Sequence, residues 1–136
     1  MESTMIEFKY IAPFLTLLFG VFIGNRLALG RDKRKEYNEI VAPIRLKLIE
    51  QRDQLNDRDR GQKIDESLFN NLEASLGLKQ FKHFLEAYEA YKLHYELAGE
   101  YVVPTFDNNG YFKWNENGKS NLCSSFNNLI ANLPVK

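Results

Sequence analysis

The sequence predicts a mainly α-helical protein, in which a single N-terminal transmembrane helix is followed by a small cytosolic helical bundle with a short β-hairpin. The prediction rests on a long apolar run near the N-terminus, a cluster of basic side chains directly after it, and helical periodicity in most of the remainder. We expect a short flank over residues 1–9, a membrane anchor over residues 10–30 and a cytosolic, mainly helical domain over residues 31–136.

The anchor is predicted from its length and composition. A helix of about twenty residues rises about 30 Å, which is the thickness of the hydrocarbon core of a bilayer. The uninterrupted apolar run ends at Gly24, and Arg26 is tolerated near the end of a span because its guanidinium reaches the headgroups. The alternative is a cleaved signal peptide, since Ala28 to Gly30 offers small residues at a cleavage position. A signal peptide needs its basic residues before the apolar run, whereas here they follow it.

The basic residues after the apolar run also predict the orientation. We call them the basic collar, and it consists of Arg26, Arg31, Lys33, Arg34 and Lys35. Short flanks rich in Lys and Arg stay in the cytoplasm, so we expect the N-terminus outside the inner membrane and residues 31–136 inside. The lipid bilayer is then the first partner, with each collar charge worth on the order of 1 kcal/mol near anionic headgroups. A lone cysteine, Cys123, is ordinary in a reducing compartment.

Small residues within the span suggest a helix contact. Gly20 and Gly24 are four residues apart, and Asn25 follows as a hydrogen-bonding side chain. This spacing lets two membrane helices approach closely, which predicts a parallel homodimer through the transmembrane helix. The alternative is coincidence, because glycine is common in membrane helices.

The remaining helices follow from apolar periodicity. Residues 31–55 have a helical pattern, with a kink or break expected near Ala42 because Pro43 clashes with the preceding turn. Asp65 is the expected N-cap of a second helix that carries Leu68, Leu72 and Leu76. A third helix over about residues 78–97 has the strongest stripe, which predicts the centre of the core: Phe81, Phe84, Leu85, Tyr88, Tyr91, Lys92 and Tyr95. A terminal helix is expected over residues 120–133, with its apolar side formed by Leu122, Phe126, Leu129, Ile130 and Leu133.

Two β-prone runs before the last helix predict a hairpin. They cover residues 101–106 and 111–114 and flank Asp107 to Gly110, whose Asn-Gly pair is a turn signal. Pro104 removes a ladder donor, so the first strand should be a short edge strand. A small hairpin buries only some of its rings, so we predict an exposed contact patch for an unknown protein partner: Tyr101, Phe106, Tyr111, Phe112 and Trp114.

The sequence offers no set of side chains for catalysis, metal binding or a cofactor. His83 and His94 would lie about 16 Å apart on one helix, too far to share a metal ion. Cys123 has no partner cysteine and reads as a small buried hydrophobe, and Asp107 to Gly110 departs from the calcium-loop pattern. The formal net charge is zero, which argues against nucleic acid as a partner.

One stretch resembles a group of known proteins. The junction Leu27 to Asn38, followed by Ala42-Pro43-Ile44, resembles small single-pass membrane proteins of bacteria and prophages that have no assigned function, and Gly110-Tyr111-Phe112 is similar to aromatic turns in them. The resemblance covers about the first third of the chain and implies an anchor, a basic junction and a helical body, but no catalytic residue.

These observations favour a membrane-anchored interaction or scaffold protein without catalytic activity. Its aromatic hairpin, or an acidic helix face formed by Glu86, Glu89, Glu96 and Glu100, would contact a protein partner. The alternative is a phage-type membrane-active protein for lysis, exclusion or toxicity that assembles through its transmembrane helix. An enzyme would require a pocket that gathers His83 or His94 with acidic side chains.

Overall fold

The computed structural model describes residues 2–106 and 109–136, with side chains from Ile11 onwards. Asp107 and Asn108, in the predicted hairpin turn, lie outside the described residues, as do Met1 and the side chains of the predicted flank over residues 1–9. The chain divides into two compact units, Met1–Glu36 and Tyr37–Lys136. The prediction of a mainly helical protein with a short two-stranded hairpin is confirmed.

The first helix is longer than the sequence suggests. Helix α1 covers Glu2–Asp53 and continues through Pro43, so the predicted break near Ala42 is wrong. Pro43 is exposed, whereas Val41 and Ile44 on either side of it are buried in the same core. Packing therefore holds both sides of Pro43 in helical geometry and offsets the backbone hydrogen bond that its missing N–H removes.

The segment after α1 contains two short helical pieces where the sequence predicts one helix. Asp65 is the N-cap as expected, because its side chain accepts a hydrogen bond from the Ser67 N–H at 3.0 Å. It caps the 3₁₀-helix η1, Glu66–Phe69, and the short helix α2 follows over Leu72–Leu76. The tight 3₁₀ turn directs Phe69 into the core, where its ring lies 4.8 Å from that of Phe84 in an edge-to-face contact.

Helix α3 covers Leu78–Leu97, which agrees with the prediction. Phe84, Tyr88, Tyr91 and Tyr95 are buried as expected, but Leu85 is 36% exposed at the edge of the stripe. The tyrosine hydroxyls also reach the backbone of the connecting segment over residues 61–64: Tyr95 donates to the Gly61 C=O, Tyr88 donates to the Ile64 C=O, and Tyr91 accepts from the Ile64 N–H. The stripe therefore holds a loop in place as well as forming the core.

Helix α4 covers Gly118–Ala131, two residues earlier at both ends than predicted. All of its expected apolar side chains are buried, including Leu133 just beyond its end. The early start has a local cause: Asn117 adopts a left-handed conformation with φ of 59°, and Gly118 approaches the Ala98 carbonyl so closely that no Cβ would fit there. The absence of a side chain at Gly118 lets the start of α4 pack against the end of α3.

The hairpin is formed by β1, Gly99–Val102, and β2, Tyr111–Trp114, in antiparallel register with Tyr101 opposite Phe112. Strand β1 begins two residues earlier than predicted and ends at Val102, so residues 103–106, predicted as strand, belong instead to the connection between the strands. Pro104 lies in this connection, where it costs no ladder hydrogen bond.

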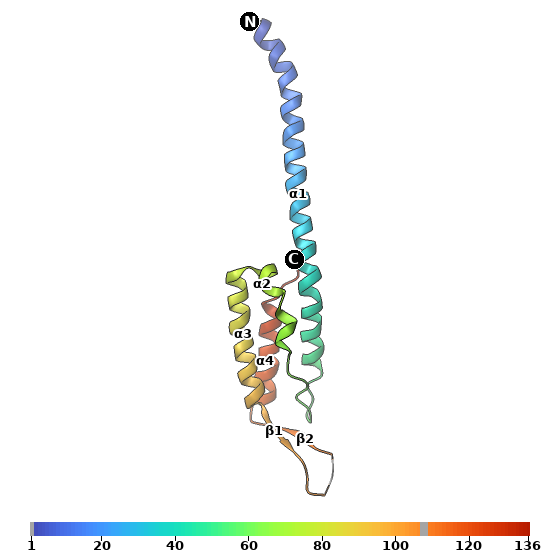
Figure 1. The fold of residues 1–136 in the computed structure, drawn as a ribbon, viewed down its shortest axis with the longest axis vertical. Helices are drawn as coiled ribbons and strands as arrows, with labels where there is room; N and C mark the ends of the chain where they lie inside the picture. The colour runs from blue at the N-terminus through green and yellow to red at the C-terminus, as the bar shows by residue number, and fades with distance from the viewer. Residues whose placement is uncertain (1, 107–108) are drawn as a thin grey trace. The chain divides into compact units, whose positions relative to one another are not determined.

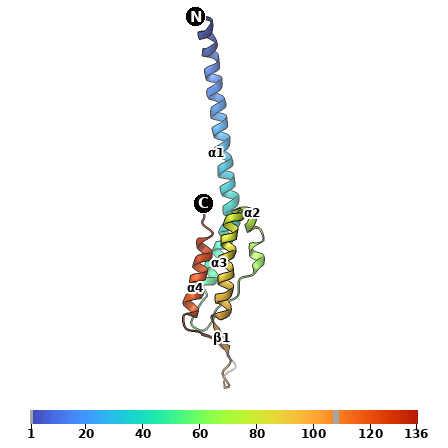
Figure 2. The same ribbon diagram turned by 90° about the vertical axis from the view of Figure 1, so that its left-hand side faces the viewer.

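Within the unit Tyr37–Lys136, α4 packs against α3, and the last part of α1 lies on the other side of α4, around one core (Figures 1 and 2). Arg45 of α1 donates to the carbonyls of Ile130 and Leu133 at the end of α4, and Asn38 exchanges two hydrogen bonds with the main chain of Lys136. The hairpin extends from the other end of this unit, where α1 ends and α3 leads into β1. The chain therefore enters this unit at one end and presents the hairpin at the opposite end.

Candidate membrane anchor and contact surface

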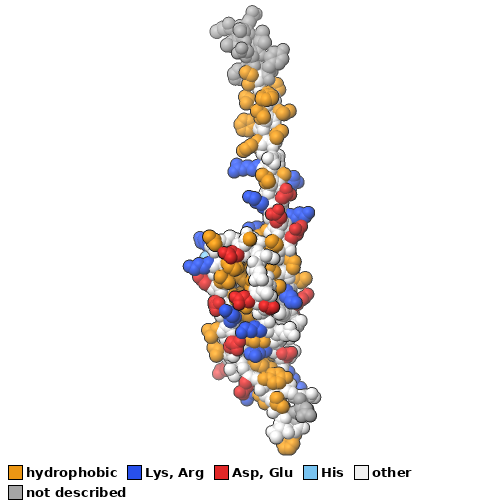
Figure 3. Space-filling model, viewed as in Figure 1, with side chains coloured by type: hydrophobic (Ala, Val, Ile, Leu, Met, Phe, Trp, Pro, Cys, Tyr) orange, Lys and Arg blue, Asp and Glu red, His pale blue; other side chains and the backbone are white. Residues whose placement is uncertain are grey.

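The first part of α1 carries large apolar side chains that nothing in the described chain covers. Each is between 48% and 66% exposed, and the set consists of Ile11, Phe14, Leu15, Leu17, Leu18, Phe19, Val21, Phe22, Ile23, Leu27 and Leu29. Figure 3 shows hydrophobic side chains along this stretch of the helix. Among the described residues this is the one helix long and apolar enough to cross a membrane.

The distribution of apolar side chains around the helix distinguishes a helix that spans a membrane from one that lies in its interface. Successive side chains turn by about 100°, so consecutive apolar residues such as Leu17, Leu18 and Phe19 point in very different directions. A helix lying in the plane of the interface has one polar face and one apolar face. Here the apolar side chains cover all sides, which is the pattern of a spanning helix. The hydroxyl of Thr16 donates to the Ala12 carbonyl at 2.9 Å, so this polar group is satisfied within the helix.

The basic collar follows this surface directly. All five of its side chains are exposed, and none forms an ion pair with any side chain in the described part of the chain. At about 100° per residue, Arg31, Lys33, Arg34 and Lys35 also point to different sides of the helix. The collar is thus a ring of unpaired positive charge at the end of an apolar cylinder.

The predicted helix-contact residues also lie on the open surface. A Cβ atom added at Gly20 or Gly24 would meet no other atom within 4 Å, and Asn25 is exposed. The two glycines are four residues apart and therefore share a face of the helix. The described chain places nothing against that face.

The predicted aromatic patch divides into an exposed part and a buried part. Phe106 is fully exposed, Tyr101 is 69% exposed and Tyr111 is 38% exposed. Phe112, in contrast, is 2% exposed and belongs to the core, so its assignment to a contact patch is wrong. Trp114 is partly buried, and its indole N–H donates to the Asn56 carbonyl at 2.8 Å.

The alternation of β2 explains this division. Successive strand residues face opposite sides, so Phe112 points into the core while Tyr111 and Lys113 point outwards. On the core side, the Arg60 guanidinium lies 5.0 Å from the centre of the Phe112 ring and 4.3 Å from that of Tyr95, which favours both contacts. The alternation of inward and outward side chains along a strand over residues 111–114 was the sequence signal that could have indicated a buried Phe112. Val103, 64% exposed, is an apolar neighbour that the sequence analysis missed.

The acidic side chains of α3 are mostly paired and do not form an open acidic surface. Glu89 pairs with Lys92 at 2.6 Å, Glu96 pairs with Lys63 at 2.6 Å, and Glu86 lies 3.6 Å from a ring nitrogen of His83. The hydrogen bond from Lys63 lowers the pKa of the Glu96 carboxyl. Glu100, predicted on this helix, is instead in β1 and forms no ion pair with the described residues.

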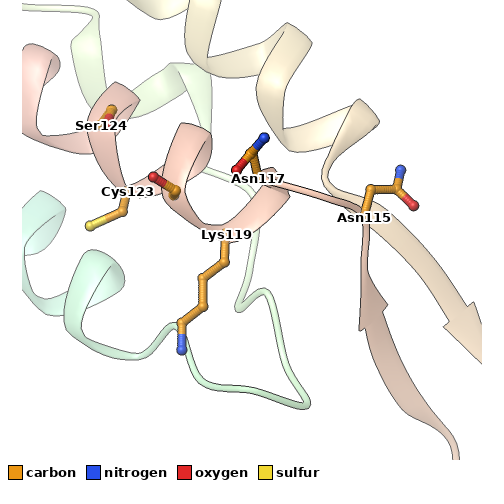
Figure 4. Close-up of a pocket in the computed structure, with 6 residues that line it drawn as sticks. Asn115, Asn117, Lys119, Cys123 and Ser124 are labelled. Carbon is orange, nitrogen blue, oxygen red and sulfur yellow. The ribbon is translucent and has the colours of Figure 1, made fainter.

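Among the described residues, several other side chains that could take part in chemistry lie in or against α4. A depression of about 540 Å³ lies at the start of α4, and Cys123, Ser124 and Lys119, drawn in Figure 4, form part of its lining. The Lys119 ammonium is bound to the Asp57 carboxylate at 2.7 Å, and this hydrogen bond lowers the Asp57 pKa. His94 is hydrogen-bonded to the hydroxyl of Ser125, which is buried. In the described part of the chain, no three His, Cys, Asp or Glu side chains are placed to hold a metal ion.

Comparisons with protein-family models, with curated proteins and with solved structures find no match to this chain. The resemblance at the junction after Leu27 therefore stays a prediction. The features of this chain that bear on its function are the apolar cylinder, the basic collar and the hairpin.

Proposed function

We propose that this chain is a membrane-anchored interaction or scaffold protein without catalytic activity, which presents a small helical domain at the cytoplasmic face of a bacterial inner membrane. The observation that carries the proposal is the apolar surface over residues 11–29, which is exposed on all sides of the helix. A soluble protein rarely exposes so large a contiguous apolar surface, because contact with water costs about 25 cal/mol for each Å². A bilayer covers all of it at once.

The collar supports the orientation. Unpaired Lys and Arg side chains around the helix attract anionic headgroups of the cytoplasmic leaflet, and they resist transfer across the membrane. Asp32 and Glu36 lie among the collar residues, but neither pairs with them within 4.0 Å. This arrangement fits an N-terminus outside the cell and residues 31–136 inside.

The position of the hairpin supports an interaction role. The end at which α1 enters the helical unit and the end that carries the hairpin lie opposite each other (Figure 1), and Phe106 of the hairpin connection is fully exposed. Because residues 37–136 follow the basic collar, the hairpin would lie with them in the cytoplasm, where a protein partner can reach it. Anchoring in a surface also raises the local concentration of two membrane proteins without any new contact between them.

The test is photo-crosslinking of the full chain in intact membranes. A crosslinking amino acid placed at Phe106 should capture a protein partner, because this side chain is fully exposed at the hairpin. The matched control places it at Leu78, which is 80% exposed at the start of α3, at the other end of that helix. Equal products from the two positions, or no adduct from Phe106, would contradict the proposed contact surface.

A second candidate is a membrane-active protein of the phage type, assembled through the transmembrane helix. The open face at Gly20 and Gly24, beside the exposed Asn25, favours it. Induced expression should then depolarise the cells, and Gly24→Leu should abolish that effect by blocking close helix approach. Leu18→Ile, which keeps the apolar surface, is the control. Depolarisation that persists in Gly24→Leu would exclude assembly through this face.

A further inference from the structure

The two edges of the hairpin differ in how they are covered. On the outer edge of β2, the Phe112 N–H donates to the Arg58 carbonyl at 2.7 Å, and the Trp114 indole N–H donates to the Asn56 carbonyl at 2.8 Å. The loop over residues 56–60 therefore closes that edge. Among the described residues, nothing comparable is bonded to the outer edge of β1.

The register shows which groups on β1 are left open. In an antiparallel pair, hydrogen-bonded and non-hydrogen-bonded residue pairs alternate. Because the Phe112 N–H points away from β1, the pair Tyr101–Phe112 is of the non-hydrogen-bonded kind. The bond from the Asn115 N–H to the Ala98 carbonyl at 2.8 Å follows the same alternation. The main-chain N–H and C=O of Tyr101 therefore point outwards, and no hydrogen bond joins them to another described residue.

The side chains along this edge define what would fit against it. Tyr101 and Val103 are apolar and mostly exposed, at 69% and 64%. The Glu100 side chain on β1 is exposed, and Lys113 is the residue opposite it on β2. Opposite charges at paired positions of neighbouring strands are favourable, whereas like charges are not. The edge therefore offers a row of backbone groups, two apolar side chains and one unpaired carboxylate.

We propose that the outer edge of β1 binds an extended segment of a partner protein as a third strand. The segment would place apolar residues beside Tyr101 and Val103, and a Lys or Arg beside Glu100. Its main chain would satisfy the outward N–H and C=O of Tyr101, as in other cases of strand addition to an open sheet edge. The outer edge of β1 would then be the surface through which the proposed scaffold protein contacts its partner. The choice of a partner protein as the occupant rests on the proposed function.

A second copy of this chain fits the edge less well. Two copies joined symmetrically by their β1 edges run antiparallel, around a two-fold axis perpendicular to the strands. The strands extend away from the end of the unit that contains Tyr37. In such a pair the two Tyr37 ends would therefore lie on opposite sides of the dimer. Two chains anchored in one membrane need both of these ends on the same side, so a segment of another protein is the better occupant.

The probe is a synthetic peptide with the sequence of residues 109–116, because β2 already pairs with β1 and carries Lys113 opposite Glu100. The full chain, ¹⁵N-labelled in lipid nanodiscs, is titrated with this peptide and followed by amide NMR and hydrogen exchange. We expect saturable binding that slows exchange of the Tyr101 amide by at least about tenfold, as a new backbone hydrogen bond requires.

Two charge variants locate the contact. Val103→Lys adds a charge beside the edge and should weaken peptide binding by at least about tenfold. The matched control Leu78→Lys adds the same charge at the exposed start of α3, away from the hairpin, and should change affinity less than about twofold. Unchanged Trp114 fluorescence in both variants would show that the hairpin remains folded.

Several results would overturn the proposal. The peptide could fail to bind saturably, or it could slow hydrogen exchange only at residues away from β1. The two variants could weaken peptide binding equally. The peptide could also speed hydrogen exchange of the Phe112 amide, which would mean that the peptide replaces β2. Concentration-dependent protection of Tyr101 without peptide would assign the edge to a second copy. Val103→Lys leaves the apolar helix surface intact and should not change the fraction of the chain that resists extraction from membranes. A failure of strand addition can therefore be told apart from a failure of the membrane anchor.

Discussion

The stability of the helical unit depends on a hydrogen bond that can be removed almost without changing the packing. Tyr91 is fully buried in the core, and its hydroxyl accepts a hydrogen bond from the Ile64 N–H at 3.1 Å. Burial raises the pKa of this hydroxyl, so it stays neutral across the range in which the protein would be studied. Tyr91→Phe keeps the ring and leaves the Ile64 N–H without a partner in the core.

The expected cost follows from the burial of both groups. A buried N–H left unsatisfied costs roughly 1–3 kcal/mol, which for a unit of this size corresponds to a Tm lower by roughly 4–20 °C. Tyr88→Phe is the comparison, because it removes only the longer 3.3 Å bond to the Ile64 carbonyl, and this oxygen has a second lone pair. We expect it to cost less than about 1 kcal/mol.

The assay is urea unfolding of the full chain in detergent micelles, followed by the fluorescence of Trp114, the only tryptophan. The transition midpoint should shift while the slope stays constant, because the surface exposed on unfolding is nearly unchanged. If Tyr91→Phe unfolds at the same urea concentration as the parent, or if Tyr88→Phe costs more, the stabilising role assigned to the hydrogen bond between the Ile64 N–H and Tyr91 is incorrect.

Three further predictions follow from the same contacts. Phe19→Lys places a charge near the middle of the apolar surface and should make membrane insertion less favourable by roughly 3–4 kcal/mol. The measurement is the fraction of the chain that resists carbonate extraction. The control is Arg26→Lys, which should be tolerated because this position is already charged. Arg45→Met removes both hydrogen bonds to the end of α4 and should destabilise the unit by roughly 1–3 kcal/mol in the urea assay; an unchanged midpoint would show that these bonds contribute nothing. Hydrogen bonds from lysines lower the pKa values of Asp57 and Glu96 in the folded state, below their ordinary values of 3.8 and 4.5. These two ion pairs therefore stabilise the fold above the ordinary pKa values, and this stabilisation is lost as the pH falls through the lowered pKa values. A urea midpoint that rises on acidification from pH 5 to pH 3 would contradict this.

Much of the helical architecture could be predicted because it depends on periodicity. The stripe from Phe84 to Tyr95 and the apolar side of α4 were identified correctly, since residues on one side of a helix are set by the 3.6-residue repeat alone. The long apolar stretch of α1 was equally clear. Its apolar side chains are exposed in the structure, because the buried core is built from residues of the unit Tyr37–Lys136 alone.

The errors have a common physical cause, which is tertiary packing that local sequence does not encode. Pro43 predicts a break, but buried neighbours on both sides keep the helix continuous. Strand β1 begins at Gly99 because the close approach of its backbone to Lys113 requires a residue without a side chain. Phe112 was assigned to the surface because its burial depends on Arg60 and on the loop that covers β2, both far away in sequence. The open outer edge of β1 is likewise visible only once the covered edge of β2 is known.

In the proposed arrangement, residues 11–29 cross the membrane and the helical unit lies in the cytoplasm. The most direct measurement is protease protection of the chain carrying a C-terminal epitope, in spheroplasts whose outer membrane has been removed. We expect added protease to leave the epitope intact until the inner membrane is lysed, and the chain to stay in the membrane fraction throughout. Loss of the epitope in unlysed spheroplasts, or a soluble product that begins near Arg31, would contradict it.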